Sequence, residues 1–356
     1  MKKKKLTGKQ KIILLGIVIL LAFLAAGAVM NYKIVLNEYF DASEAKCTLP
    51  DISRGFIPQG ITYDEGTDHI FITGYMGNGK VSPIYGINNA TGENDCAILM
   101  RTNEGDNFRG HAGGMSVYEN RLYVAGSTDA CMYGFDIQEV LSEGSKANSD
   151  DASVSDVETT SNSKKEKVYV NAKNRIELKS ANDHIRVSFT SADSELLYAG
   201  EFHKDPIFQT DKSHNIKTVD GMQKGLLFGF RLDEEENAVP VKAYSIPDNI
   251  QGACFYEHYI FLSRSHGIFP SEILTYDLDQ IACEGDYTFL ETEIPLYVLN
   301  ESKAVKIKKI PPMSEEMVIA DGKMYILYES ASNRYIIGKW MGLKQLCATP
   351  IDYFLE

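Results

Sequence analysis

Two positions of a repeated segment carry polar side chains whose types suit acid–base or ligand-binding chemistry. Five segments of the chain share one pattern, in which two short apolar stretches flank a tight polar turn. Equivalent positions of a repeat take equivalent places in the fold, so we expect these side chains to gather at one end of the molecule. The position where the first stretch starts holds Gln59, His111, Arg186, Gln251, Glu315 and Glu316, and the position where the second stretch ends holds Tyr75, Ser127, Glu201, Arg264 and Glu329.

The carboxylates in this set favour a site for a hard cation. Calcium takes about six to eight oxygen ligands, which carboxylate and amide groups supply. Glu315, Glu316 and Glu329, with the amide oxygens of Gln59 and Gln251, would offer such a set. If the protein holds a metal ion, this interpretation predicts Ca²⁺ at the three glutamates.

A second interpretation is catalytic, and a third is structural. His111 and a carboxylate could act as base and acid on a bound substrate, with Arg186 or Arg264 holding an anionic group and Glu201 supplying a further carboxylate. The same side chains could instead form a hydrogen-bonded ring that satisfies the ends of strands. No hydrolase, metalloprotease, phosphate-loop or dinucleotide motif in a suitable context decides between these interpretations.

The repeated segments begin at residues 58, 111, 185, 250 and 313. Their second stretches contain IFIT, LYVA, LLYA, YIFL and MYIL, which is typical of strands buried on both faces. Most are followed by a third strand, such as PIYGINN, and by an outer strand, such as DCAILMR. Four-stranded units repeated around an axis form a β-propeller. We therefore predict an all-β, five-bladed propeller over residues 46–356, with six blades as the alternative.

The last blade lacks an outer strand of its own, because the chain ends soon after GLKQLCATPI. The segment EAKCTLP precedes the first repeat and matches the outer-strand position. We expect it to close the last blade, which would place Cys47 beside Cys347. In an oxidising compartment these two residues would form a disulfide. The alternative is two free, half-buried thiols, and Cys254 is interpreted as a core residue.

The first 45 residues differ from the rest. A tail at 1–11 contains six lysines and no acid, and an apolar segment at 12–31 follows, with a linker at 32–45. About 20 apolar residues span a bilayer, and preceding lysines favour a cytoplasmic N-terminus. These features predict a single-pass cell-membrane protein with an extracellular body. The alternative is cleavage of a signal segment near Ala28 and secretion of the body.

Charge and composition limit the partners and the order of the chain. The formal net charge is −13, and all six lysines of the tail lie outside the predicted body, so nucleic acid would be repelled. No CxxC pair occurs among the six cysteines, which argues against structural zinc. The segment 142–167 is rich in Ser, Asp and Lys and predicts a disordered loop. No helical period appears outside the apolar N-terminal segment.

The segments PQGITYD, GHAGGMSVY, NIQGACF and PPMSEEMVIADGKMYILYES resemble those of bacterial secreted or membrane-anchored β-propeller proteins without an assigned activity. The resemblance covers roughly residues 55–335 and implies a propeller in an exported location. More distantly, the PQGI segment looks like that of lactonase and strictosidine-synthase-like propellers, which are six-bladed and use a central metal.

These observations lead to two functional hypotheses. The first is a membrane-anchored extracellular propeller that binds a small molecule, a glycan or a protein at its axial face. The second is a hydrolase of esters, lactones or glycosides that acts through the same residues, with a possible central calcium ion.

Overall fold

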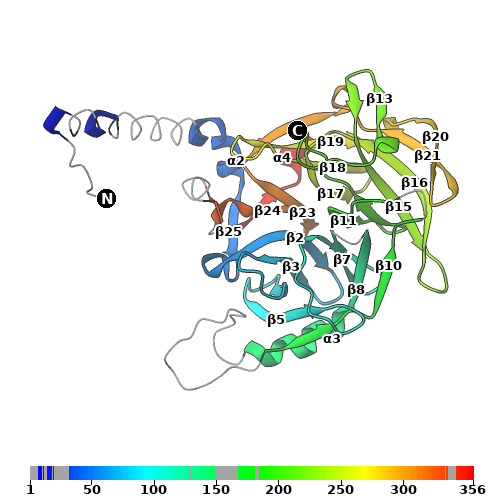
Figure 1. The fold of residues 1–356 in the computed structure, drawn as a ribbon, viewed down its shortest axis with the longest axis horizontal. Helices are drawn as coiled ribbons and strands as arrows, with labels where there is room; N and C mark the ends of the chain where they lie inside the picture. Colours follow the sequence, from blue (N-terminus) through cyan, green and yellow to red (C-terminus); the bar gives the residue numbers. More distant parts are fainter. Residues whose placement is uncertain are drawn as a thin grey trace.

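The computed structural model describes residues 7–9, 11, 14–17, 19, 32–127, 130–148, 167–180, 184–332, 334–335 and 342–356. Five antiparallel sheets are arranged around a common axis, each with an inner strand near the centre and an outer strand at the periphery (Figure 1). The prediction of a five-bladed, all-β propeller is confirmed, and the six-bladed alternative is excluded.

The blades are numbered in chain order. Blade 1 contains β2 (Phe56–Asp64), β3 (His69–Met76), β4 (Pro83–Asn88) and β5 (Asn94–Arg101). Blade 2 contains β6 (Ala112–Tyr118), β7 (Arg121–Gly126), β8 (Cys131–Asp136) and β10 (Asn174–Glu177). Blade 3 contains β11 (Phe189–Ala192), β12 (Leu197–Gly200), β15 (Gly225–Leu232) and β16 (Ala238–Ile246). Blade 4 contains β17 (Ile250–Tyr256), β18 (Tyr259–Arg264), β19 (Ser271–Asp277) and β22 (Lys306–Ile310).

Blade 5 is closed by the two ends of the propeller, as the sequence predicts. It contains β23 (Ser314–Ala320), β24 (Lys323–Tyr328), β25 (Gln345–Pro350) and, as its outer strand, β1 (Glu44–Thr48). In the antiparallel pairing of β1 with β25, Cys47 lies opposite Leu346 and Ala45 opposite Cys347. Both thiols are free, so the disulfide between Cys47 and Cys347 stays a prediction.

Two blades have more than the four expected strands. The strand β9 (Tyr169–Asn171) pairs in parallel with β5, and β21 (Thr292–Val298) pairs in parallel with β16 and carries β20 (Cys283–Phe289) outside it. Each of these additions comes from an insertion before the outer strand of one blade and extends the outer edge of the blade before it. A separate hairpin pairs β13 (Ile216–Thr218) with β14 (Gly221–Gln223).

Within the described residues from 36 onwards, three short α-helices correct the expectation that none lies outside the apolar N-terminal segment. They are α2 (Asn37–Ala42), α3 (Ile137–Gly144) and α4 (Asp352–Leu355). The Asp136 side chain caps α3 by accepting from the Glu139 peptide N, and Val140 packs into the core. The 3-10 helices are η1 (Ile52–Arg54), η2 (Ser145–Asn148), η3 (Lys212–His214), η4 (Leu278–Gln280), η5 (Glu301–Lys303) and η6 (Glu329–Ala331).

Some predicted segments fall on residues that the structure does not describe. Residues 142–148 of the predicted loop belong to α3 and η2, and residues 149–166 lie outside the described residues. Most of the predicted membrane segment at 12–31 also lies outside them. Within the described ranges, no helix is long and apolar enough to cross a membrane.

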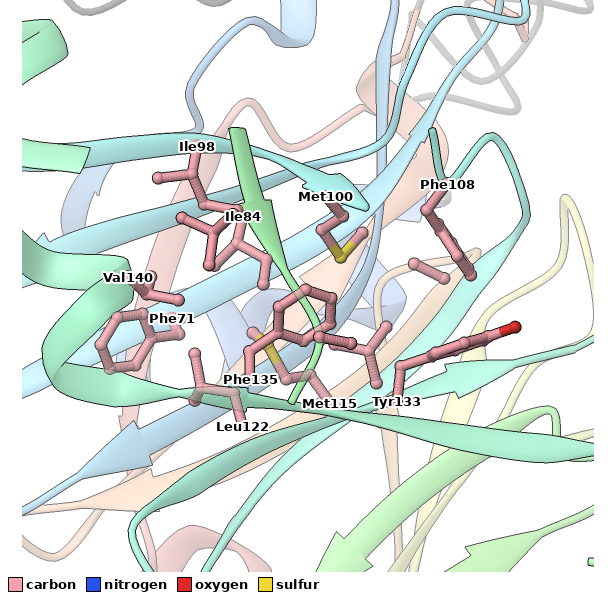
Figure 2. Close-up of a cluster of buried hydrophobic side chains, with 14 of the residues drawn as sticks. Phe71, Ile84, Ile98, Met100, Phe108, Met115, Leu122, Tyr133, Phe135 and Val140 are labelled. Carbon is pink, nitrogen blue, oxygen red and sulfur yellow. The ribbon is translucent and has the colours of Figure 1, made fainter. Parts of the chain in front are cut away.

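The hydrophobic core consists of clusters between neighbouring blades. Figure 2 shows the one between blades 1 and 2, where Phe71, Ile84 and Ile98 face Leu122 and Phe135. Equivalent clusters lie at the other four blade interfaces, and Cys254 belongs to the one between blades 4 and 5, as predicted. The apolar runs of the sequence are thus explained, because inner and middle strands bury both of their faces.

Candidate functional site at the axial face

A β-bulge interrupts the pairing of four of the five inner strands at the same level. The register shifts fall between Pro58 and Gly60 in β2, Ala112 and Met115 in β6, Ile250 and Gly252 in β17, and Ser314 and Met317 in β23. A bulge turns side chains out of the regular alternation of a strand and commonly lies next to a site. The bulged residues include the predicted Gln59, Gln251, Glu315 and Glu316, which explains why these polar residues recur there.

Glu316 belongs to β23, the inner strand of blade 5, and lies at the axis. Its carboxyl group links this blade to the inner strands of blades 1, 2 and 3. Its Oε2 atom accepts hydrogen bonds from the peptide N of Ile61 and of Met115, both at 2.8 Å, and its Oε1 atom accepts from the peptide N of Thr190 at 3.3 Å. Burial raises the pKa of Glu316, while the three peptide donors oppose that rise. The residue is 1% exposed, so its carboxylate belongs to the scaffold.

Gly114 and Gly252 allow the inner strands to approach Glu316 closely. A Cβ atom on Gly114 would lie 2.5 Å from the peptide N of Thr190 and 2.6 Å from Oε1 of Glu316. A Cβ atom on Gly252 would lie 2.7 Å from the Cα atom of Glu316. Inner strands crowd near the axis of the propeller, and here the absence of a side chain lets the strands reach the carboxylate.

Glu315 and Glu329 form a second, different pair of carboxyl groups. The Nε2 atom of Gln251 donates to Glu315 Oε1 at 3.2 Å, and the Nε2 atom of Gln59 donates to Glu329 Oε2 at 3.4 Å. Burial raises the pKa of Glu329 to about 7. Burial, and then the charges of Glu329 and Glu316, raise the pKa of Glu315 well above its ordinary value. Groups of this kind can hold and release a proton near neutral pH.

Tyr75 and His111 form a flat surface beside this pair. Their rings stack with centroids 4.5 Å apart, and the Arg334 guanidinium donates to the Tyr75 hydroxyl. The Tyr335 hydroxyl hydrogen-bonds to Glu329. Burial, followed by the charges of Arg334 and Arg186, lowers the pKa of His111 to about 4, so its imidazole is neutral at physiological pH.

A hollow of about 370 Å³ lies between blades 2 and 3 at the same face. Its lining includes the predicted Ser127, Arg186 and Glu201, together with His184 and Thr210. Ser127 Oγ donates to the main-chain oxygen of His111, so the hollow borders the aromatic surface. The hollow and the acidic pair therefore belong to one extended axial site.

Arg186 presents an unpaired cation to this hollow. Its guanidinium carbon lies 5.4 Å from the centroid of the Phe208 ring. Among the residues that the structure describes, no hydrogen-bond or ion-pair partner is found for this side chain. Since a cation beside a cavity attracts anions, Arg186 is suited to hold an anionic group.

The buried Glu201 is held by its own neighbours. Its Oε2 atom lies 2.8 Å from Nδ1 of His214, which is fully buried, and it also accepts from the peptide N of Leu226 at 3.3 Å. The Oε1 atom accepts from the peptide N of Arg186 at 3.3 Å. Glu201 thus positions Arg186 at the hollow, and its carboxylate is already occupied.

Arg264 cannot hold an anion in the arrangement observed. Its Nε and Nη2 atoms donate to Oε2 of Glu272 at 2.9 and 2.5 Å, and its Nη1 atom donates to Oε2 of Glu301 at 2.6 Å. Two carboxylates therefore neutralise this guanidinium. Of the two arginines that the sequence offers as anion ligands, only Arg186 is available.

The predicted calcium ligands take different roles. Glu316 accepts from three peptide N atoms. Glu315 and Glu329 accept from the Nε2 atoms of Gln251 and Gln59, so the three carboxyl groups all face N–H donors in this arrangement. Within the described residues, the two groups whose ligand atoms converge as for a metal ion lie elsewhere, at His203, Asp205 and Asp248 and at His258, Asp277 and Asp279. Calcium at the three glutamates stays a prediction.

Sequence reasoning missed Arg334, Tyr335 and His214. The two former residues follow η6, beyond the repeated segment, and only their contacts with Tyr75 and Glu329 place them at the axial face. His214 lies in η3, inside an insertion of blade 3, and its spacing from Glu201 carries no periodic signal. Arg334 lies four residues beyond the last repeated segment, so no repeat position marks it in the sequence.

The strand order and the cores between blades define a five-bladed β-propeller. The chain matches no protein-family model and no curated protein. It is similar to the solved structure of glutaminyl cyclase from Myxococcus xanthus, with a TM-score of 0.42 and 9% identity over 86% of this chain and 94% of that chain. It is also similar to XC5397 from Xanthomonas campestris, a gluconolactonase, with a TM-score of 0.40 and 8% identity over 86% of this chain and 88% of that chain. BamB from Moraxella catarrhalis gives a TM-score of 0.33 and 8% identity over 82% and 84%. These values support no argument about activity, which has to be inferred from the site itself.

Proposed function

We propose that the propeller binds a small polar ligand bearing an anionic group at its axial face. The observation that carries this proposal is the unpaired Arg186 guanidinium at a hollow of about 370 Å³. Drug-sized ligands occupy cavities of roughly 300–1,000 Å³, so a sugar acid or a sugar phosphate is of suitable size. The hydroxyl groups of Ser127 and Thr210 and the amide of Gln209 line the hollow and suit the polar body of such a ligand.

The remainder of the axial site supports a ligand that is larger than one anionic group. The stacked rings of Tyr75 and His111 offer an apolar surface, and the neutral imidazole adds no charge. Arg334 adds a second cation beside Tyr75. A polar molecule with one flat face and one acidic group would contact all of these features. Sugar acids have both properties.

Replacement of Arg186 by alanine is expected to weaken binding of an anionic ligand roughly ten- to hundredfold, because a charge-assisted hydrogen bond contributes about 1.5–3 kcal/mol. The measurement is a thermal-shift titration of the full chain with galacturonate and glucose 6-phosphate, each compared with its neutral parent sugar. The acidic member should raise the melting temperature by mass action.

Arg231→Ala is the matched control for this titration. Arg231 is also an arginine of blade 3, but it lies on β15, and its Nη2 atom lies 3.8 Å from the carboxylate of Glu195. This variant should bind as the unmodified chain does. Equal shifts with the neutral sugars, or full binding by Arg186→Ala, would contradict the proposal.

A specific observation favours hydrolysis as a second candidate function. Glu329, whose burial raises its pKa to about 7, lies beside Glu315, and such a group can act as general acid or base. An ester, lactone or glycoside bound at Arg186 would then place its bond toward the axis, near the acidic pair. The ligand-binding proposal stands without this step.

If the protein is a hydrolase, Glu329→Gln is expected to lower kcat about 10²- to 10⁴-fold, since the amide cannot transfer the proton. The rate should be followed with aryl esters, aryl glycosides and lactones between about pH 5 and pH 9. Glu234→Gln, which removes an exposed carboxylate of the turn between β15 and β16, is the control. An unchanged rate in Glu329→Gln would exclude Glu329 as acid or base.

A further inference from the structure

Three potential metal ligands converge beside the axial hollow, outside the site described above. They are His203 and Asp205, which follow β12, and Asp248, which precedes β17. One nitrogen or oxygen from each residue lies within 4.8 Å of the other two. The peptide N of Asn249 donates to the main-chain oxygen of His203 at 2.9 Å, which joins the two loops.

Two buried atoms of this group lack a hydrogen bond. His203 is 3% exposed, and within the described part of the chain neither its Nε2 atom nor Oδ1 of Asp248 has a hydrogen-bond partner. The Nε2 atom lies 3.3 Å from Oδ1 of Asp205 without hydrogen-bond geometry. A buried polar atom without a partner costs about 1–3 kcal/mol, so two such atoms in one cluster call for a physical cause.

Thr210 contacts one ring nitrogen of His203. The Thr210 peptide N donates to Nδ1 at 3.3 Å, and the Thr210 hydroxyl, which also donates to the main-chain oxygen of Lys224, lies 3.0 Å from Nδ1. These contacts fix the orientation of the ring, so that Nε2 lies toward Asp205. A neutral imidazole that uses Nε2 is a common metal ligand.

We propose that His203, Asp205 and Asp248 bind a divalent transition-metal ion, with Zn²⁺ as the representative case. The ligand atoms would be Nε2 of His203 and one carboxylate oxygen from each aspartate. Zinc–ligand bonds of about 2.0–2.2 Å allow two ligands to lie at most about 4.4 Å apart, close to the observed convergence. The contact of Nδ1 with the Thr210 hydroxyl is of the kind that orients a metal-bound histidine.

The chemistry of the three ligands selects the class of ion. An imidazole nitrogen suits zinc and its transition-metal neighbours better than calcium or magnesium, which prefer oxygen ligands. Lys224 contacts Oδ2 of Asp205, which leaves Oδ1 for the ion. Three protein ligands would leave a coordination position for water or for a bound molecule.

The full chain, treated with a chelator and dialysed, should bind about one equivalent of Zn²⁺, measured by mass spectrometry of the metal. Zinc at about a hundred times its dissociation constant should raise the melting temperature by roughly 5 °C. Both His203→Ala and Asp248→Asn should weaken Zn²⁺ binding at least tenfold. Cobalt substitution provides an independent readout, because the visible spectrum of bound Co²⁺ reports nitrogen and oxygen ligands.

A matched pair of variants separates this site from the other converging group. His258→Ala and Asp279→Asn alter the more exposed group and should leave Zn²⁺ binding unchanged. The melting temperature without metal shows whether each variant folds, and Asp248→Asn preserves shape if His203→Ala does not. Saturable binding that survives Asp248→Asn, binding that is lost in His258→Ala, or no binding by the unmodified chain would each overturn the proposal.

Discussion

Replacement of Glu316 by alanine is expected to destabilise the propeller by about 3 kcal/mol or more. The change leaves three buried peptide groups, those of Ile61, Met115 and Thr190, without an acceptor. Each unsatisfied buried donor costs about 1–3 kcal/mol, and the removed side chain also leaves a cavity at the axis. Because the stability of a domain is only about 5–15 kcal/mol, this loss is a large share of the total.

The loss of stability should appear in the free energy of unfolding of the whole protein and also in the hydrogen exchange of particular amides. Urea unfolding of the variant should show the lower free energy of unfolding. Hydrogen exchange should show that the amides of Ile61, Met115 and Thr190 lose protection, since they belong to three different blades and share only this carboxylate. A purely local defect in blade 5 would leave those three amides protected.

Glu315→Gln is the matched control on the same strand. Its carboxyl group accepts from the side-chain amide of Gln251, and among the described residues no peptide N donates to it. The substitution keeps an acceptor oxygen and should cost less than about 1 kcal/mol. If both variants lost the same stability, the connecting role of Glu316 would be refuted.

The repeat architecture could be predicted because it depends on local pattern. A hairpin of two apolar stretches around a tight turn is visible in the sequence at five places, and each forms the two innermost strands of a blade. The closing strand at Glu44–Thr48 was also predictable, since the chain ends without an outer strand for β25. Both inferences use only the order of strands along the chain.

The additional strands could not be predicted in the same way. The pairs β5 with β9 and β16 with β21 join insertions to the outer edge of the preceding blade, so their partners lie far away in the sequence. The helix α3 is only eight residues long, too short for a strong helical period. Contacts with distant parts of the chain determine where these strands and this helix form.

The sequence predicted several side chains at the axial face but did not show which hydrogen-bond and ion-pair partners they have. The equivalence of Glu315 and Glu316 in sequence hides the bulge, which directs Glu316 to peptide donors and Glu315 to Gln251. Similarly, Arg186 before an inner strand and Arg264 at the end of a second strand were both expected at the axial face, yet only Arg264 meets carboxylates, those of Glu272 and Glu301. Partners from other loops determine which group remains free.

The other large expected effect is a pair of opposing pH dependences of stability. Burial raises the pKa of Glu329 from an ordinary 4.5 to about 7, against the opposing influence of Tyr335, Arg334 and Gln59. Between these pH values the folded protein retains a proton that the unfolded chain releases. This contribution to stability is present below pH 4.5 and is lost as the pH rises to 7, by up to about 3 kcal/mol. Burial also raises the pKa of Glu315, which acts with the same sign.

His111 acts with the opposite sign in nearly the same range. Burial, with the charges of Arg334 and Arg186, lowers the pKa of His111 from 6.5 to about 4. Below pH 6.5 the unfolded chain takes up a proton that the folded imidazole refuses, so this contribution to stability is lost as the pH falls to 4. The His111 side chain is exposed on one side, and solvent screening makes its effect smaller than that of Glu329.

Single variants separate the two contributions. The free energy of unfolding, measured in urea at pH 4.5, 5.5, 6.5 and 7.5, should rise for Glu329→Gln relative to the unmodified chain by up to about 3 kcal/mol as the pH increases. For His111→Gln, the same difference should fall with increasing pH, because the variant lacks the group whose protonation destabilises the folded state at low pH. Titrating groups far from the replaced residue are common to the compared proteins and cancel. Glu315 does not cancel, because the Glu329 charge that raises its pKa is absent from Glu329→Gln, and this change adds to the rise of the difference with pH. A difference that does not change with pH for Glu329→Gln would mean that this carboxyl group titrates alike in both states, and the acid–base role at the axis would lose its physical basis.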